Sequence, residues 1–176
     1  MNFMKGTIVK CLEEMVTTQF GAAQWKKSLE DAGSKAATLF LPFDDIDDAV
    51  VLNVITAVCN NLKLSLAQAA DAFGMYWVNV YSQKMYPQYY AKHRTAKDFL
   101  LNLDALHVTM TKTLKNARPP RFEYAWRDPK TLIMHYKSHR GLIDFAVGLV
   151  KGIGKFYQEE LEVKKSGADW IQVVFR

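Results

Sequence analysis

Apolar residues recur every three or four positions over most of the first two-thirds of the chain, which is the spacing typical of amphipathic helices. The segments with this spacing, and therefore the predicted helices, are 10–19, 22–32, 49–60, 65–81 and 95–115. A proline among aromatic residues at 86–90 predicts a turn with a short helix. The strongest helical pattern is the last one, whose apolar face carries Phe99, Leu103, Leu106, His107, Met110 and Leu114.

The boundaries of these helices follow from residues that start or stop a helix. Four aspartates in the segment 44–48 favour the positive end of a helix dipole and predict the start of the third helix. A calcium loop is excluded there because its central glycine and closing glutamate are missing. Ser65 is predicted to cap the fourth helix. Pro119 and Pro120 are predicted to end the fifth, because proline lacks the backbone donor.

After the two prolines the pattern changes to the alternation that is typical of strands. Segments 121–127 and 131–137 predict one antiparallel hairpin, and segments 161–165 and 170–175 predict a second. A helix is expected between the hairpins, over 142–158. Helices followed by an antiparallel sheet predict an α+β fold, with the helical two-thirds packed against the C-terminal sheet.

The composition fits one globular domain. A length of 176 residues, with 49% hydrophobic and 23% charged residues, excludes disordered, collagen-like and coiled-coil chains. The longest apolar stretches, such as 145–150, fall far short of the ~20 residues that a membrane span needs, so no membrane insertion is expected. No signal peptide is seen, and Cys11 and Cys59 lie in segments that look helical. A reducing, cytoplasmic setting is expected.

The charge is unevenly distributed along the chain. Residues 1–90 carry 7 basic and 9 acidic side chains, whereas residues 91–176 carry 16 basic and 9 acidic ones. A basic half can attract nucleic acid, although the interleaved acidic residues weaken that signal. It can equally hold a small acidic ligand, and composition leaves both open.

His107 differs from the other three histidines because it alone lies on the apolar face of a strongly predicted helix. A neutral imidazole in an apolar pocket is what axial ligation of heme or another metal requires. The alternative is a core histidine that bonds a backbone carbonyl, which is the commoner situation for a single histidine. The residue alone leaves both open.

A second candidate site is the array of Tyr136, Ser138 and Arg140. In an extended segment these residues alternate with their neighbours, so all three are predicted to point to the same face. A phenol, a hydroxyl and a guanidinium suit a ligand with one or two carboxylates. The same donors could bind a phosphate, or the three side chains could form a solvated strand face that binds no ligand. No zinc-spaced Cys/His cluster, phosphate loop or nucleophile elbow is visible, so hydrolase and nucleotide-binding functions are unsupported.

Four motifs extend this picture along nearly the whole chain. They are Met4-Lys5-Gly6-Thr7-Ile8-Val9, Leu103-Asp104-Ala105-Leu106-His107, Arg118-Pro119-Pro120-Arg121-Phe122 and Tyr136-x-Ser138-x-Arg140. Together they resemble the H-NOX family, the heme nitric oxide/oxygen-binding domains. The last motif is the most specific, because a histidine lies about thirty residues before it.

The resemblance implies a site for heme b, that is, iron protoporphyrin IX. By this resemblance His107 is the single protein ligand to the iron. The two heme propionates are bound by Tyr136, Ser138 and Arg140. The residues that contact the porphyrin and support its distortion are Pro120, Ile8 and Leu149. Apolar walls with a few placed polar groups are the general pattern of a cofactor site.

The distal residues implied by the resemblance bear on gas selection. Oxygen-binding members place a tyrosine five residues after the motif arginine, and its hydroxyl stabilises bound oxygen. This chain has Phe145 there, with Trp77 in place of a supporting asparagine and Leu12 in place of a tryptophan. The resemblance therefore implies a site open to nitric oxide but poor at retaining oxygen. Tyr81 is an alternative donor, although packing is the preferred interpretation.

The function implied by the resemblance is that of a bacterial-type, stand-alone nitric oxide sensor and not an enzyme. One domain is expected over 1–176, with a helical distal part at 1–62 and a proximal part at 63–176. Heme is expected to be buried between the helical two-thirds and the C-terminal sheet. Gas binding would release His107 and flatten the heme. The implied partner is a histidine kinase or a cyclic-di-nucleotide enzyme, and carbon monoxide is a further candidate ligand.

Two alternative functions remain open, and one region departs from the family pattern. The chain could be an oxygen-binding or redox-active heme protein that uses Tyr81, or a heme-free basic module for nucleic acid, which is disfavoured. Some bacterial relatives bind zinc near the C-terminal hairpin. No structural zinc is expected here, because that region holds Lys164, Lys165, Trp170 and Ile171.

Overall fold

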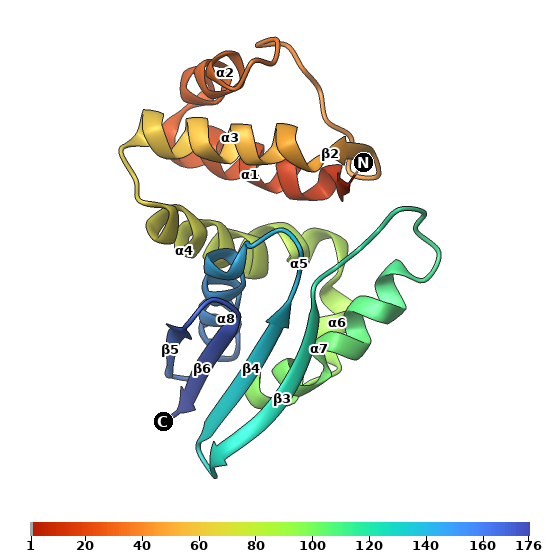
Figure 1. Ribbon diagram of the computed structural model, residues 1–176, viewed down its shortest axis with the longest axis vertical. Coiled ribbons are helices and arrows are strands. Elements are labelled where there is room, and N and C mark those ends of the chain that lie inside the picture. Colours follow the sequence, from red (N-terminus) through yellow and green to blue (C-terminus); the bar gives the residue numbers. More distant parts are fainter. Residues whose placement is uncertain (1) are drawn as a thin grey trace. The chain divides into compact units, whose positions relative to one another are not determined.

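The computed structural model describes residues 2–176 and confirms the α+β fold (Figure 1). The chain divides into two compact units. Unit 1 comprises the residues up to Ala69 together with Asn116–Arg118. Unit 2 comprises Ala70–Lys115 and Pro119–Arg176. The expected division of a single domain at residue 62 stays a prediction.

Unit 1 is mainly helical, as its hydrophobic spacing predicts. Its helices are α1 (Gly6–Phe20), α2 (Ala22–Asp31) and α3 (Asp48–Leu62), and its strands are β1 (Phe3–Lys5) and β2 (Asp45–Asp47). The Asp47 carboxylate accepts a hydrogen bond from the Ala49 amide at 2.8 Å, which confirms that the aspartates cap α3. The antiparallel pair β1–β2 was not predicted, because strands of three residues are too short to show alternation.

Unit 2 contains the remaining helices. They are α4 (Leu66–Tyr76), whose first turn belongs to unit 1, η1 (Trp77–Tyr81), α5 (Ser82–Met85), α6 (Pro87–Ala91), α7 (Ala96–Thr111) and α8 (Ile143–Tyr157). Ser65 caps α4 as predicted: its hydroxyl accepts from the Gln68 amide at 3.2 Å, and the Gln68 side chain accepts from the Ser65 amide. Leu66, the first residue of α4, is exposed.

The predicted helix over 65–81 is not regular to its end. After Tyr76 the chain widens into η1, a π-helical turn in which the Ser82 amide bonds the Trp77 carbonyl. The Val78 carbonyl accepts from the side chains of Gln83 at 2.8 Å and Ser82 at 3.3 Å. Side chains therefore satisfy a carbonyl in the wide turn, a device that a hydrophobic pattern does not reveal.

Helix α7 ends four residues earlier than predicted, at Thr111 and not at Lys115. Its start is as expected, since the Thr95 hydroxyl accepts from the Asp98 amide at 3.0 Å. Near its end the Thr111 hydroxyl bonds back to the His107 carbonyl at 2.7 Å, a bond that competes with regular helix. Asn116 follows with a φ of 59°, so the chain has left the helix before the prolines are reached.

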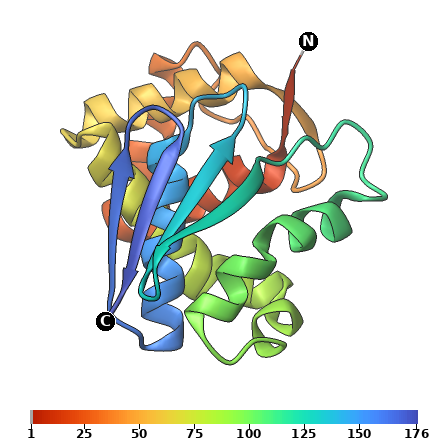
Figure 2. The ribbon, with the colours of Figure 1, turned by 60° about the horizontal axis from the view of Figure 1, so that its bottom comes forward.

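The sheet of unit 2 confirms both predicted hairpins. Its strands are β3 (Arg121–Asp128), β4 (Thr131–Lys137), β5 (Leu161–Ser166) and β6 (Trp170–Phe175), antiparallel in the order β3-β4-β6-β5. One face packs with α7 and α8 to form the core of the unit (Figure 2). The buried residues on that face are Phe122, Leu132, Met134, Tyr136, Val163, Ile171 and Val173.

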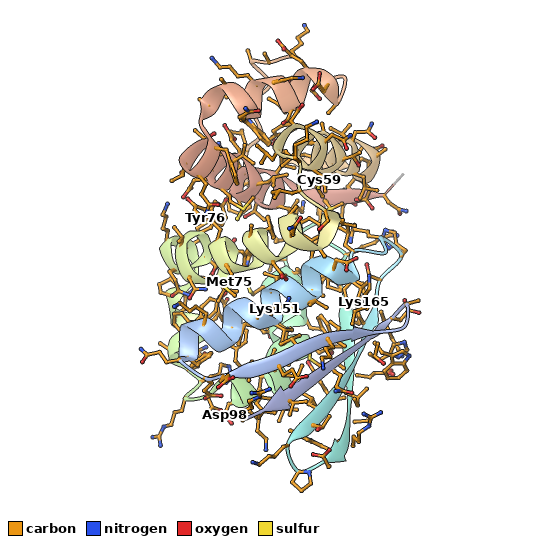
Figure 3. All side chains as sticks on the ribbon, turned by 90° about the vertical axis from the view of Figure 1, so that its left-hand side faces the viewer. Cys59, Met75, Tyr76, Asp98, Lys151 and Lys165 are labelled. Atoms are coloured by element: carbon orange, nitrogen blue, oxygen red, sulfur yellow. The ribbon has the colours of Figure 1, made fainter. Side chains whose placement is uncertain are left out.

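Helices α4 and α8 cross with their backbones in contact (Figure 3). A Cβ at Gly74 would lie 2.0 Å from the backbone carbon of Gly148, and one at Gly152 would lie 2.5 Å from the Gly74 oxygen. An ion pair between Lys151 and Asp71, 2.7 Å apart, joins the same helices. Only glycine permits this approach, so the crossing is fixed by residues without side chains.

Within residues 2–176, no single helix is long and apolar enough to cross a bilayer. Helix α3 and the stretch Leu66–Met85 pass such a test together, but only as a pair bent by 106°.

Candidate heme-binding site

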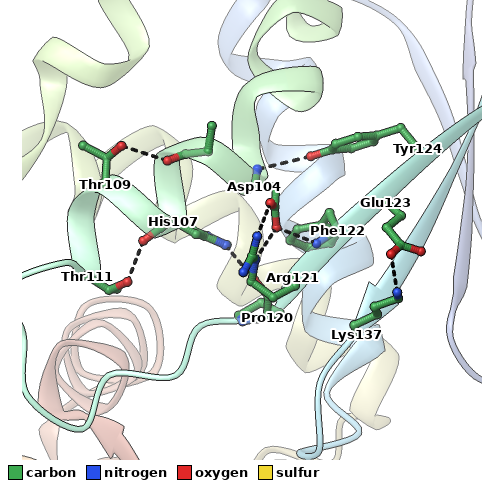
Figure 4. A network of polar contacts seen from close by, with 11 residues as sticks. Asp104, His107, Thr109, Thr111, Pro120, Arg121, Phe122, Glu123, Tyr124 and Lys137 are labelled. Carbon is green, nitrogen blue, oxygen red and sulfur yellow. Dashed lines mark hydrogen bonds and ion pairs between the residues drawn. The ribbon is translucent and has the colours of Figure 1, made fainter.

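The imidazole of His107 is tethered to the start of the sheet. It lies on α7, half-buried, and its Nδ1 is 3.1 Å from the carbonyl oxygen of Pro120 (Figure 4). A carbonyl oxygen can only accept a hydrogen bond, so Nδ1 is the nitrogen that carries the proton. The lone pair therefore resides on Nε2, which is the form that a metal ligand requires.

The surroundings of His107 keep its imidazole neutral. Burial lowers the pKa of His107 below its ordinary value, and this effect outweighs the opposing influences of the Pro120 carbonyl and the Asp104 charge. An uncharged ring at neutral pH can donate from one nitrogen and bind a metal through the other.

An ion pair next to His107 was missed by the sequence analysis. The Asp104 carboxylate accepts hydrogen bonds from Nε and Nη2 of Arg121, each at 2.7 Å, and from the Phe122 amide at 2.8 Å (Figure 4). Arg121 lowers the pKa of the Asp104 carboxyl group below its ordinary range, so the carboxylate is charged. A sequence signal existed, because Asp104 lies one helical turn before His107 and Arg121 follows Pro120 directly.

The predicted array of Tyr136, Ser138 and Arg140 does not share one extended face. Strand β4 ends at Lys137, Ser138 follows it, and Arg140 lies in a turn before Gly141, whose φ is +64°. The alternation of a strand therefore stops after Tyr136. The turn nevertheless brings the residues together, since the Arg140 amide donates to the Ser138 hydroxyl at 3.3 Å and Ser138 hydrogen-bonds the Tyr136 side chain.

Tyr136 is buried in the core of unit 2. Burial raises the pKa of its phenol, although the Ser138 hydrogen bond and the Arg140 charge act in the opposite direction. The phenol therefore keeps its proton near neutral pH and is able to donate it in a hydrogen bond.

Phe122 links the two polar groups of the site. Its ring centroid lies 5.9 Å from that of His107 and 5.9 Å from that of Tyr136. One apolar ring thus lies near both the neutral imidazole and the phenol within the same unit.

The predicted distal residues of unit 2 also lie together. Phe73 stacks on Trp77 at a centroid distance of 5.8 Å and meets the edge of Phe145 at 5.2 Å. Tyr81 is buried and lies 5.4 Å from Trp77. Leu149, one turn after Phe145 on α8, is half-buried against the core of the unit. Phe73 was not predicted as a site residue.

The other two predicted residues belong to unit 1. Leu12 is buried and Ile8 is half-buried, one turn apart on α1. Their spacing of four places both side chains along one stripe of the helix.

These residues fit the chemistry of heme. A neutral imidazole, oriented through Nδ1, offers a single nitrogen ligand. The phenol of Tyr136, the hydroxyl of Ser138 and the guanidinium of Arg140 are donors suited to carboxylates. Aromatic and aliphatic side chains supply the apolar walls that a flat macrocycle needs.

Comparison with known proteins decides the family. The sequence model of the family described as Haem-NO-binding matches residues 5–165. The chain belongs to the H-NOX family. Members of this family bind heme, sense gases and signal to partners, and as sensor domains they are generally not catalytic.

Solved H-NOX structures share the fold of this H-NOX protein over almost its whole length. A variant of Cs H-NOX with an unnatural cyanophenylalanine is 26% identical, with a TM-score of 0.85, covering 98% of this chain and 97% of that one. A T. tengcongensis H-NOX variant is 25% identical, with a TM-score of 0.82 and 98% of both chains covered. An oxygen-binding H-NOX domain related to soluble guanylate cyclases is 26% identical, with a TM-score of 0.80, covering 98% and 95%.

Proposed function

We propose that this H-NOX protein senses nitric oxide through a ferrous b-type heme held by His107. The observation that carries the proposal is the 3.1 Å contact between the His107 Nδ1 and the Pro120 carbonyl. It leaves a neutral ring with its lone pair on Nε2, and it joins the ligand to the strand that begins the sheet. Heme supplies a coordination position that is open to a diatomic gas.

The other residues proposed to contact the heme have two roles: they bind its propionates or pack against its porphyrin. Arg140, Ser138 and Tyr136 donate to the heme propionates, which makes an acidic cofactor the ligand of the basic half of the chain. Pro120 and Leu149 are the residues that press on the porphyrin, together with Ile8 of unit 1. These roles require only side chains that donate hydrogen bonds to the propionates or pack against the porphyrin.

Gas selection depends in this proposal on Phe145, whose side chain lacks a proton to donate. Phe145 stands where oxygen-binding relatives are expected to carry a tyrosine, and its buried ring has no hydroxyl. Trp77 stands where those relatives are expected to carry an asparagine, and Leu12 stands where they are expected to carry a tryptophan. Nitric oxide does not depend on a hydrogen bond to be retained, so the site favours it over oxygen; carbon monoxide is a further candidate ligand.

The signal begins at His107. Once its imidazole is no longer held as a ligand, α7 and the Pro120 segment relax, and this two-state element changes the surface offered to a partner. The proposed partner is a histidine kinase or a cyclic-di-nucleotide signalling enzyme in the cytoplasm. The protein itself acts as a single sensor domain without catalysis, membrane insertion or nucleic-acid binding.

The alternative function is that of an oxygen-binding or redox-active heme protein. The observation that favours it is the placement of Tyr81, a buried phenol next to Trp77. If Tyr81 were the donor, Tyr81→Phe would abolish oxygen binding and leave nitric oxide binding intact.

The experiment that tests the proposal is an absorption spectrum of the reduced protein, recorded without gas, in air and with nitric oxide. We expect a five-coordinate ferrous spectrum that air leaves unchanged and nitric oxide shifts. A stable spectral change in air would favour the alternative function. Absence of a Soret band after heme is supplied would refute any heme function.

Replacing Phe145 with tyrosine is expected to create oxygen binding, because the new hydroxyl can donate to the ligand. A hydrogen bond to a charged acceptor contributes about 1.5–3 kcal/mol, so oxygen should dissociate on the order of 10- to 100-fold more slowly. Stopped-flow spectroscopy measures this rate. Phe156→Tyr, at a half-buried position farther along α8, is the matched control and should change nothing. If Phe145→Tyr also retains no oxygen, the missing hydroxyl is not the reason for exclusion.

A further inference from the structure

Helix α7 is attached to the start of β3 at two successive levels (Figure 4). At one level His107 donates to the Pro120 carbonyl. One helical turn earlier, Asp104 accepts from both Arg121 and the Phe122 amide. The Asp104 amide in turn donates to the Tyr124 hydroxyl at 3.2 Å. The first residues of the strand therefore run along one face of the helix, fixed at each step.

The geometry of the carboxylate makes this attachment directional. Oδ1 of Asp104 accepts from the Arg121 Nε and from the Phe122 backbone, while Oδ2 accepts from the Arg121 Nη2. A bidentate guanidinium–carboxylate pair permits few relative orientations. Because side chain and backbone are held by the same group, the peptides that flank Arg121 are fixed, including the one that contributes the Pro120 carbonyl.

We infer that Asp104 and Arg121 are positioning residues for His107. They hold the Pro120 carbonyl in line with Nδ1 and so fix the rotation of the imidazole about its side chain. They also make the His107 turn and the start of β3 move as one body. The inference rests on the proposed function, since it assigns these residues to the ligand that the function requires.

The exposure of the pair indicates which interaction matters more. The side chains of Arg121 and Asp104 are 57% and 21% exposed, so solvent screens their charges and the ion pair alone contributes little to stability. The Phe122 backbone lies in a buried residue, and its amide loses its acceptor if the carboxylate is removed. Asp104 should therefore matter more than Arg121.

The same strand offers a matched control. Glu123 of β3 forms an exposed ion pair with Lys137 of β4. Figure 4 draws no bond from Glu123 to α7 or to His107. Glu123→Gln removes a charge of the same sign, two residues after Arg121, and leaves the attachment of Asp104 intact.

The test compares Asp104→Asn, Arg121→Gln and Arg121→Lys with Glu123→Gln. Hydrogen exchange of the Phe122 amide and the ¹⁵N signals of the His107 ring are recorded by NMR. In Asp104→Asn the Phe122 amide keeps only an uncharged acceptor oxygen and the bidentate bond to Arg121 is lost, so we expect exchange on the order of tenfold faster. A smaller increase is expected in Arg121→Gln, with partial rescue in Arg121→Lys. The ring signals should shift toward a mixture of tautomers in Asp104→Asn and stay unchanged in Glu123→Gln.

A second measurement separates this inference from the proposed function. The band of the iron–imidazole stretching vibration of the reduced protein is expected to fall in frequency and broaden in Asp104→Asn, to change less in Arg121→Gln and to stay unchanged in Glu123→Gln. Exchange and ring signals that match those of Glu123→Gln overturn the positioning role, even if heme is bound normally. Absence of heme from the unaltered protein overturns the proposed function, while the NMR comparison still decides whether Asp104 positions the imidazole.

Discussion

Replacing His107 with glycine is expected to abolish stable heme binding, and free imidazole is expected to restore it. The ring is the only ligand proposed for the iron, and its tether to Pro120 orients it for that role. Loss of an outer-shell partner already costs roughly 10- to 100-fold in metal affinity, so loss of the ligand itself should cost more. The heme-to-protein ratio after gel filtration, read from the Soret band, measures the effect.

The control for this experiment is His93→Gly. His93 follows α6, is half-buried and contacts the edge of Phe99 at 5.5 Å, so it resembles His107 in burial but not in attachment to Pro120. Its replacement should leave the heme content unchanged. An unchanged heme content in His107→Gly would exclude His107 as the ligand, and rescue by imidazole would show that the protein had kept its fold.

Replacing Gly148 with alanine is expected to lower the free energy of unfolding by about 3 kcal/mol. A Cβ there would lie 2.1 Å from the Ala70 oxygen and 2.7 Å from its carbonyl carbon, which are backbone atoms that cannot rotate away. Alanine favours a helix by up to about 1 kcal/mol, which offsets only part of this cost. For a chain of this size the melting temperature should fall by roughly 6–12 °C, measured by circular dichroism on heme-free protein.

The matched control lies on the same helix. A Cβ at Gly154 would lie 2.9 Å from the side chain of Leu161, which can adjust, and 3.1 Å from the backbone oxygen of Glu159, a much milder contact than the 2.1 Å at Gly148. Gly154→Ala should therefore lose much less stability than Gly148→Ala. Equal melting temperatures for the two variants would contradict the close crossing of α4 and α8.

Much of the fold was predictable because local signals agreed with the final structure. Ser65 and the aspartates before α3 mark helix starts, and both make the expected cap bonds. The hairpin β3–β4 could be located because a proline-containing turn separates two alternating segments. In these cases the chemistry of a few neighbouring residues suffices.

The errors have a common physical origin in contacts between distant residues. The π turn at Trp77–Tyr81 is accompanied by side-chain bonds to the Val78 carbonyl and by packing on α8. The end of β4 before Ser138 depends on a turn through Gly141 that periodicity does not indicate. The Asp104–Arg121 pair joins a helix to a strand seventeen positions away, so hydrophobic periodicity does not reveal it.

The sequence indicated which residues belong to the candidate site better than it indicated how their side chains are arranged. His107 stood out by its place on an apolar face, and its tether to Pro120 matches the carbonyl bond considered for a core histidine. That bond does not exclude a ligand role, because it occupies Nδ1 and leaves Nε2. The two interpretations of a single histidine therefore describe two nitrogens of one ring.

The π turn makes the distal residues sensitive to chain length. Before it, α4 is held to α8 by Gly74 and Gly148; after it, Ser82 is held by the Tyr90 hydroxyl at 2.8 Å. Deleting one residue between these anchors would restore a regular helix and rotate one side by about 100° relative to the other. Phe73 and Trp77 could not then keep their places while both anchors held. A single-codon deletion here is thus a route by which the proposed distal site could be remodelled in one evolutionary step.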